Sequence, residues 1–156
     1  MPKGRAGGIR TGLFIRDYLL GRETRWERSA YKGGGWEAVG PSREEEFPAS
    51  MHRSLCGKII EENERRPASQ RRRGPVYSSF YRYLKRLEQF GLVERTGREE
   101  PIEGTPAGLL RLRNHEHPGI VEGVRVYYRL TASGRTEPPN EAFLNPIAVW
   151  YSRGYG

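Results

Sequence analysis

The chain has 156 residues, only 35% of them hydrophobic, and its 20 glycines and 11 prolines indicate much irregular backbone. The net charge is +8 and is carried mainly by arginine, which favours a polyanionic partner, nucleic acid before an anionic membrane surface. One cysteine, Cys56, excludes an intrachain disulfide, and no apolar run is long enough for a transmembrane helix.

The N-terminus lacks the apolar stretch of a signal peptide, so we expect a cytoplasmic protein associated with the nucleoid or with ribosomes. Residues 1–48 are expected to form a basic, Gly- and aromatic-rich N-terminal extension. Residues 1–12 predict a flexible basic arm that lies along phosphates or is simply disordered. Residues 13–20, LFIRDYLL, predict a short helix that Gly21 ends.

Aromatic and charged residues alternate over 22–40, around Trp26, Tyr31 and Trp36. These rings either stack on exposed bases or anchor a loop to the domain, and we favour anchoring because Trp and Tyr dominate burial in apolar-poor chains. Residues 41–48 are expected to be a linker. Its acidic cluster, 44–46, predicts a solvated surface or the start of a helix.

Residues 49–65 predict a helix with an apolar stripe of Met51, Leu55 and Ile59 that Pro67 ends. Residues 68–73 predict a short second helix. Gly74 and Pro75 then supply a turn.

The strongest helix signal lies over 76–90, where four apolar residues recur at helical spacing: Tyr77, Phe80, Leu84 and Leu87. Polar residues share the opposite face. Ser78 or Ser79 is expected to cap the start, and Gly91 the end. Residues 92–96 predict a short strand.

Between Arg65 and Arg86 the chain has eight basic residues and no acidic one: Arg65, Arg66, Arg71, Arg72, Arg73, Arg82, Lys85 and Arg86. A helix that is merely solvated usually interleaves the two signs of charge. This run therefore indicates contact with phosphates.

Residues 97–123 form a long insert, with a possible short strand at 109–113. Residues 124–131, VRVYYRLT, alternate and predict a strand with Tyr128 and Leu130 on one face and Tyr127 and Arg129 on the other. The tail, 135–156, is apolar and aromatic. We expect it to pack on the domain or on a partner.

Two phrases, YRYLKRLEQFGLVERTG and RVYYRLTASGR, resemble the helix–strand–wing–strand half of the winged helix-turn-helix superfamily. The resemblance covers residues 49–134, with 97–123 as an unusually long wing. It implies an α+β fold with a three-helix core and a small antiparallel β-wing. Transcription regulators share these phrases, as do some small-subunit ribosomal proteins. The segment Arg71–Gly74 resembles the basic loop of the ribosomal type.

The resemblance implies a transcription regulator that binds double-stranded DNA with helix 76–90 in the major groove. The helix would present Ser78, Ser79, Arg82, Lys85, Arg86 and Gln89 to the DNA. The backbone contacts would be Arg71, Arg72 and Arg73 before the helix and Arg111, Arg113 and Arg125 in the wing.

Two alternatives stay open. One is binding to structured RNA or the ribosome, which the basic Gly-rich arms and aromatics suit. The other is a protein–protein module or homodimer that uses the wing insert and the terminal segments.

We expect that the protein is not an enzyme and has no cofactor, because the sequence contains no Ser-His-Asp order and no nucleophile-elbow motif. His52 and Cys56 stand four residues apart, but two ligands do not make a metal site.

Overall fold

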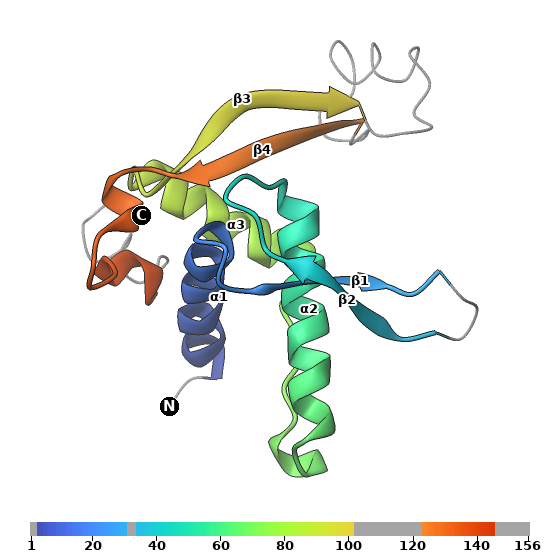
Figure 1. The fold of residues 1–156 in the computed structure, drawn as a ribbon. Coiled ribbons are helices and arrows are strands. Elements are labelled where there is room, and N and C mark those ends of the chain that lie inside the picture. The colour runs from blue at the N-terminus through green and yellow to red at the C-terminus, as the bar shows by residue number, and fades with distance from the viewer. Residues whose placement is uncertain (1–2, 31–33, 102–122, 146–156) are drawn as a thin grey trace.

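The computed structural model describes residues 3–30, 34–101 and 123–145, with side chains from Arg10 onward. Over these ranges the chain is α+β, with three α-helices and two two-stranded antiparallel sheets (Figure 1). In chain order the elements are α1 (Lys3–Leu19), β1 (Thr24–Arg28), β2 (Trp36–Pro41), α2 (Pro48–Glu64), the 3₁₀ turn η1 (Ala68–Gln70), α3 (Tyr77–Gln89), β3 (Val93–Pro101), β4 (Val124–Leu130) and the 3₁₀ turns η2 (Ser133–Arg135) and η3 (Glu141–Phe143).

Helix α1 is much longer than expected, because it begins at Lys3 and includes most of the predicted flexible arm. The prediction of an arm is wrong from Lys3 onward. Tertiary contacts outweigh the low helix propensity of glycine here. Gly12 lies against the backbone of Phe143, where an added Cβ would come 2.0 Å from the carbonyl oxygen. Arg10 forms an ion pair of 3.0 Å with Glu62 of α2.

Helices α1 and α3 end in the same way, as the glycines predicted. Gly21 and Gly91 both have φ of 76°. At each end the glycine N–H donates to the carbonyl three residues earlier. The N–H of the following residue donates to the carbonyl five residues earlier, from Arg22 to Asp17 (2.9 Å) and from Leu92 to Leu87 (3.0 Å). This Schellman arrangement satisfies the last carbonyls of each helix.

A β-hairpin occupies most of the 22–40 region that the sequence predicted to be a loop. Strands β1 and β2 pair with Trp26 opposite Ala38 and Arg28 opposite Trp36, after a register shift between Arg25 and Trp26. The loop prediction is wrong because short strands with mixed charges carry no clear apolar alternation.

The hairpin is fastened to α2 through β1. The Trp26 N–H donates to Ser54 Oγ at 3.1 Å, and Lys58 pairs with Glu23 at 2.7 Å. Gly57 lets Trp26 approach the helix closely, because an added Cβ would lie 2.4 Å from the Cβ of Trp26. Trp26 is thus an anchor, as predicted.

The segment between α2 and α3 is mostly extended. The predicted helix over 68–73 is wrong, since only η1 turns and Arg71 has ψ of 144°. Asn63 holds this segment extended. Its amide nitrogen donates to the Arg72 carbonyl at 2.6 Å, and its amide oxygen accepts from the Arg72 N–H at 2.8 Å. We call residues 71–76 the return segment, because they run back along α2 (Figure 1).

Helix α3 buries Phe80, Leu84 and Leu87, which confirms three of the four residues of the predicted apolar face. The fourth, Tyr77, is 39% exposed, so the prediction is wrong at that position. The predicted cap is wrong. Val76 occupies the N-cap position, and no side chain caps the helix there. Ser78 and Ser79 lie within the first turn and are exposed.

Strands β3 and β4 form an antiparallel hairpin after α3, and we call it the wing. It starts with Val93 opposite Leu130, and β3 continues to Pro101, five residues beyond the predicted end at 96. Glu46 bridges to Tyr128 with backbone bonds of 3.1 and 2.8 Å, which adds a third segment to this sheet. The possible strand at 109–113 lies outside the described residues.

Two side chains near the wing are buried. One of them, Glu46, contradicts the solvated-surface alternative for the acidic cluster 44–46, and it lies directly before Phe47, the N-cap of α2. Tyr127 is buried, because Phe47 packs against its ring with centroids 5.5 Å apart. Glu46 is fully buried rather than solvated and accepts a 2.5 Å hydrogen bond from the Tyr18 hydroxyl. Burial, and then this bond, raise the pKa of Tyr18.

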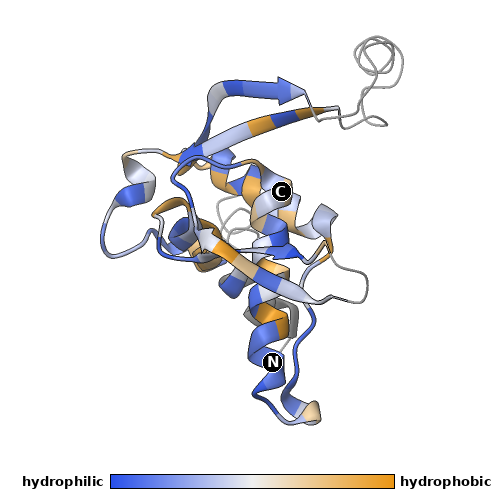
Figure 2. Cartoon of the chain, turned by 45° about the vertical axis from the view of Figure 1, so that its right-hand side comes forward, coloured by the Kyte–Doolittle hydropathy of each residue, from blue (hydrophilic) through white to orange (hydrophobic). Residues whose placement is uncertain are grey.

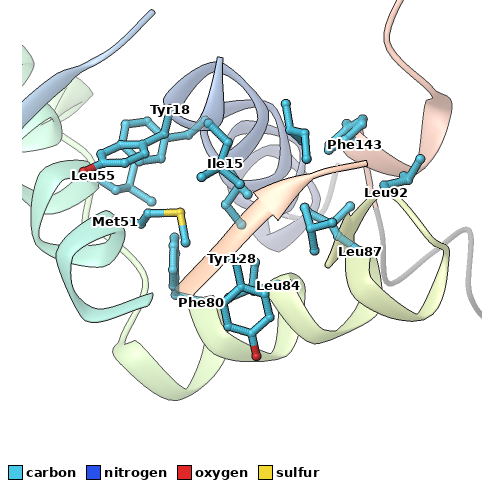
Figure 3. Close-up of a cluster of buried hydrophobic side chains, with 14 of the residues drawn as sticks. Ile15, Tyr18, Met51, Leu55, Phe80, Leu84, Leu87, Leu92, Tyr128 and Phe143 are labelled. Carbon is cyan, nitrogen blue, oxygen red and sulfur yellow. The ribbon is translucent and has the colours of Figure 1, made fainter. Parts of the chain in front are cut away.

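The core lies where α1, α2, α3 and β4 meet, and Figure 3 shows Tyr18, Met51, Phe80 and Tyr128 converging there. The C-terminal segment joins it through Phe143 and Ala142, both fully buried. This confirms the predicted packing of the tail as far as residue 145. Residues 146–156 lie outside the described ranges.

The Thr–x–x–Gly phrase after β4 makes a tight junction with the end of α3. The Thr131 hydroxyl donates to the Gly91 carbonyl at 2.5 Å and accepts from the Gly134 N–H at 3.1 Å. A Cβ on Gly134 would lie 2.1 Å from the Leu92 carbonyl oxygen, so only glycine fits. In the part of the chain that the structure describes, no helix is long and apolar enough to cross a bilayer.

Candidate nucleic-acid interface

The outward face of α3 carries the residues that the sequence assigned to it. Ser78, Ser79, Arg82 and Gln89 are exposed, while Lys85 and Arg86 are half-buried. The buried residues Phe80, Leu84 and Leu87 fix this face toward solvent, because they hold the opposite side of the helix in the core.

The two basic residues in the second half of α3 already have partners. Lys85 pairs with Glu88, which also lies 3.6 Å from Arg95 of the wing. Arg86 donates to Gln89 Oε1 at 2.9 Å. Contacts with a ligand would compete with these bonds, so the first half of α3, around Arg82, is the more available part.

The three arginines of the return segment have different surroundings. Arg71 donates from Nε to the carbonyls of Asn63 (3.1 Å) and Arg66 (3.2 Å), at the C-terminal end of α2. A cation there also interacts favourably with the helix dipole. Arg72 lies near Arg10 and Arg66. The Arg10 charge is the main reason that the pKa of Arg72 is lowered.

Most of the basic run lacks acidic partners in the folded chain. Arg65 pairs with Glu61 at 3.0 Å, and Lys85 pairs with Glu88. Five others have no ion pair with any carboxylate among the described residues: Arg66, Arg71, Arg72, Arg73 and Arg82. Figure 2 shows the hydrophilic character of the far end of α2 and of the return segment. Positive charge is therefore concentrated here.

The wing differs, because its arginines have acidic or aromatic partners. Arg125 lies 3.6 Å from Glu100 and 4.6 Å from the Phe47 ring centroid, and Arg129 pairs with Glu94 at 2.8 Å. A hydrogen bond from Tyr127, together with Arg98, holds the pKa of Glu100 below its ordinary value. The two other predicted wing residues, Arg111 and Arg113, lie outside the described residues.

A cavity that the sequence did not predict lies between the β1–β2 hairpin, α2 and the return segment. It has a volume of about 380 Å³. Its lining includes Arg28, Trp36, Cys56, Ile59, Ile60, Arg72, Arg73 and Gly74. The alternation of tryptophan and arginine over 22–40 was the only sequence signal for this cavity. The contact of these residues with Arg72 and Arg73 depends on the tertiary fold.

His52 and Cys56 do lie together, with Sγ 3.6 Å from Nε2. The same Nε2 is 2.7 Å from the Pro75 carbonyl oxygen, which can only accept, so this nitrogen carries a proton and cannot ligate a metal. Over the described ranges, no three histidine, cysteine or acidic residues gather as metal ligands would.

Comparison of the chain with protein-family models, with curated proteins and with solved structures gives no match.

Proposed function

We propose that the protein binds double-stranded DNA, with α3 in the major groove and the end of α2 with the return segment on the phosphate backbone. The observation that carries the proposal is the position of a one-sign basic surface. Five arginines without a carboxylate partner among the described residues lie just after α2, along the return segment and on the exposed face of α3. Such a surface attracts a polyanion.

The order of elements supports a winged helix-turn-helix arrangement. Three helices share one core, Gly91 follows the C-cap of α3, and the β3–β4 hairpin comes directly after it and is joined by the segment at Glu46. In this proposal α3 is the recognition helix and β3–β4 is the wing. The β1–β2 hairpin, between α1 and α2, is an addition to that plan.

Roles within the interface follow from exposure and bonding. Arg82 and Gln89 have the length and donors to reach base edges, and Ser78 and Ser79 suit phosphate or base contacts. Arg72 and Arg73 contact the phosphate backbone of the DNA in this proposal. Arg71 also supports the end of α2, so its contribution combines positioning and charge.

The test replaces Arg82 with alanine and measures affinity for duplex DNA by fluorescence anisotropy at fixed salt. We expect a loss of about 5-fold to 150-fold, which corresponds to about 1–3 kcal/mol for a base-edge contact. Arg22→Ala is the matched control, because Arg22 is an exposed arginine of the α1–β1 turn, paired with Glu137. Equal affinities for the two variants would contradict the proposal.

Structured RNA is the second candidate ligand, and the cavity beside Trp36 favours it, because unpaired bases stack on aromatic and arginine side chains. Co-sedimentation with ribosomal subunits, and competition between duplex DNA and hairpin RNA of equal length, separate the two candidates.

A homodimer through the terminal segments remains a proposal that is compatible with either ligand. Light scattering with and without residues 146–156 tests it, because this deletion leaves the buried Phe143 in place.

A further inference from the structure

We infer that the cavity between the β1–β2 hairpin, α2 and the return segment binds a nucleotide, a planar aromatic base that carries a phosphate. We call it the Trp36 cavity. The ligand is either an unpaired nucleotide of a strand or a free mononucleotide. The site is distinct from the α3 face and does not need the proposed groove contact, but it shares Arg72 and Arg73 with the proposed backbone contacts.

The hairpin forms one wall. Trp36 lies opposite Arg28 in the β1–β2 register, and the guanidinium carbon of Arg28 stands 4.9 Å from the centroid of the Trp36 ring. The indole and the guanidinium both offer flat surfaces on which a base can stack.

Helix α2 and the return segment form the remaining walls. Ile59 and Ile60 give an apolar floor beside Cys56. Gly74 lies beside that helix, where an added Cβ would make ordinary contacts of 3.5 Å with both the Cys56 sulfur and the Ile59 Cδ1. Arg72 and Arg73, which directly precede Gly74, also line the cavity.

The charge of the lining selects an anion. Among the described residues, three guanidinium groups and no carboxylate line the Trp36 cavity. A cavity of about 430 Å³ between α1 and α2 differs, because Asp17, Glu23 and Glu62 are among its lining residues. The repulsion between Arg10 and Arg72, which lowers the pKa of Arg72, would be relieved by a bound phosphate. Burial raises the pKa of the Cys56 thiol, so no thiolate competes with that anion.

The size and rigidity of the cavity also suit a nucleotide. Its volume of about 380 Å³ lies within the usual range for small-molecule sites, about 300–1,000 Å³. The hairpin wall is held by the Trp26–Ser54 hydrogen bond and the Glu23–Lys58 ion pair. A preformed wall reduces the entropy that binding must overcome.

The test titrates the full chain with adenosine monophosphate, with a twelve-residue thymidine strand and with a blunt duplex of equal length, and follows tryptophan fluorescence. Stacking on Trp36 should quench the signal with the strand, the mononucleotide or both. Trp36→Ala should weaken that binding by about 5-fold to 150-fold, the usual effect of removing one base stack. Quenching by the mononucleotide identifies a free nucleotide as sufficient, and quenching by the strand alone identifies an unpaired nucleotide.

Arg28→Ala is the second variant and should weaken the same binding. Arg25→Ala is its matched control, because Arg25 is also on β1 but donates to the Pro41 carbonyl and does not line the cavity. Arg82→Ala should weaken duplex binding and leave the quenching unchanged, so failure of the α3 proposal is visible separately. The inference is overturned if neither ligand quenches, or if Trp36→Ala, folded by circular dichroism, binds both ligands as the wild type does.

Discussion

At the scale of single residues, Arg16 holds the C-terminal segment against α1. Its side chain is buried and donates to the carbonyls of Gly134 (3.2 Å) and Thr136 (2.9 Å) and to the Glu137 carboxylate (2.8 Å). The guanidinium also lies 5.9 Å from the Phe143 ring centroid. These three hydrogen bonds offset the cost of burying the Arg16 charge at this junction.

The Arg16 contact predicts a specific dependence of stability on pH. The hydrogen bond from Arg16 is the main reason that the pKa of Glu137 lies below its ordinary value of 4.5. The unfolded chain therefore binds the proton more readily. The stabilisation is fully present above the ordinary pKa and is lost as pH falls through the lowered value in the folded chain.

Glu137→Gln should therefore flatten the rise of unfolding free energy with pH in this acidic window. Urea unfolding of the variant and the wild type between about pH 3 and 6 measures it, since the ordinary carboxyl pKa falls there. Arg22→Ala removes only the longer contact of 3.4 Å and should have a smaller effect. Parallel pH profiles for wild type and Glu137→Gln would show that the pair does not stabilise the fold.

Little of this residue-scale bonding is visible in the sequence. Arg16 and Glu46 look like ordinary solvated charges there, because their partners lie 28 to 121 residues away. The two helix-terminating glycines, Gly21 and Gly91, were predictable because a helix C-terminus is set by residues close in sequence. The tight fit of Gly134 against Leu92 was not predictable, because these two residues are far apart in sequence and meet only in the folded chain.

At the scale of elements, the docking of the β1–β2 hairpin on α2 depends on a glycine inside a helix. Alanine in place of a helical glycine normally stabilises a protein, by about 0.5–1 kcal/mol. At Gly57 the Cβ would overlap Trp26, at 2.4 Å from its Cβ and 2.7 Å from its Cγ.

Gly57→Ala should consequently destabilise the protein, by about 1–3 kcal/mol from overpacking. Chemical denaturation followed by circular dichroism measures the loss. Gly35→Ala is the control, because no atom lies within 4 Å of a Cβ added there. A Gly57→Ala variant more stable than the wild type would mean that the hairpin does not pack on α2 as described.

The elements differ in how well their sequences predict them. Helices α2 and α3 have a strong apolar period and were placed to within one or two residues. Strand β4 was predicted from its alternation, but Tyr127 is buried because Phe47 covers the second face of the wing. The short helix expected at 68–73 failed because Asn63 bonds the backbone of Arg72 in an extended conformation.

At the scale of the whole molecule, positive charge is distributed unevenly. The arginines of the described part of the wing have carboxylate partners, whereas five arginines without one among the described residues lie just after α2, along the return segment and on the first half of α3. The basic run in the sequence predicted this surface. The sequence could not predict the Trp36 cavity, because residues 28, 36, 56 and 73 meet only in the folded chain.

The central claim is that this surface binds the phosphates of duplex DNA, and the dependence of affinity on salt tests it most directly. With about six phosphate contacts, log K against log salt concentration should fall with a slope of about −5 for the wild type, and Arg73→Ala should reduce the slope by about 1. Arg22→Ala should leave the slope unchanged. A wild-type affinity that does not change with salt would contradict the account.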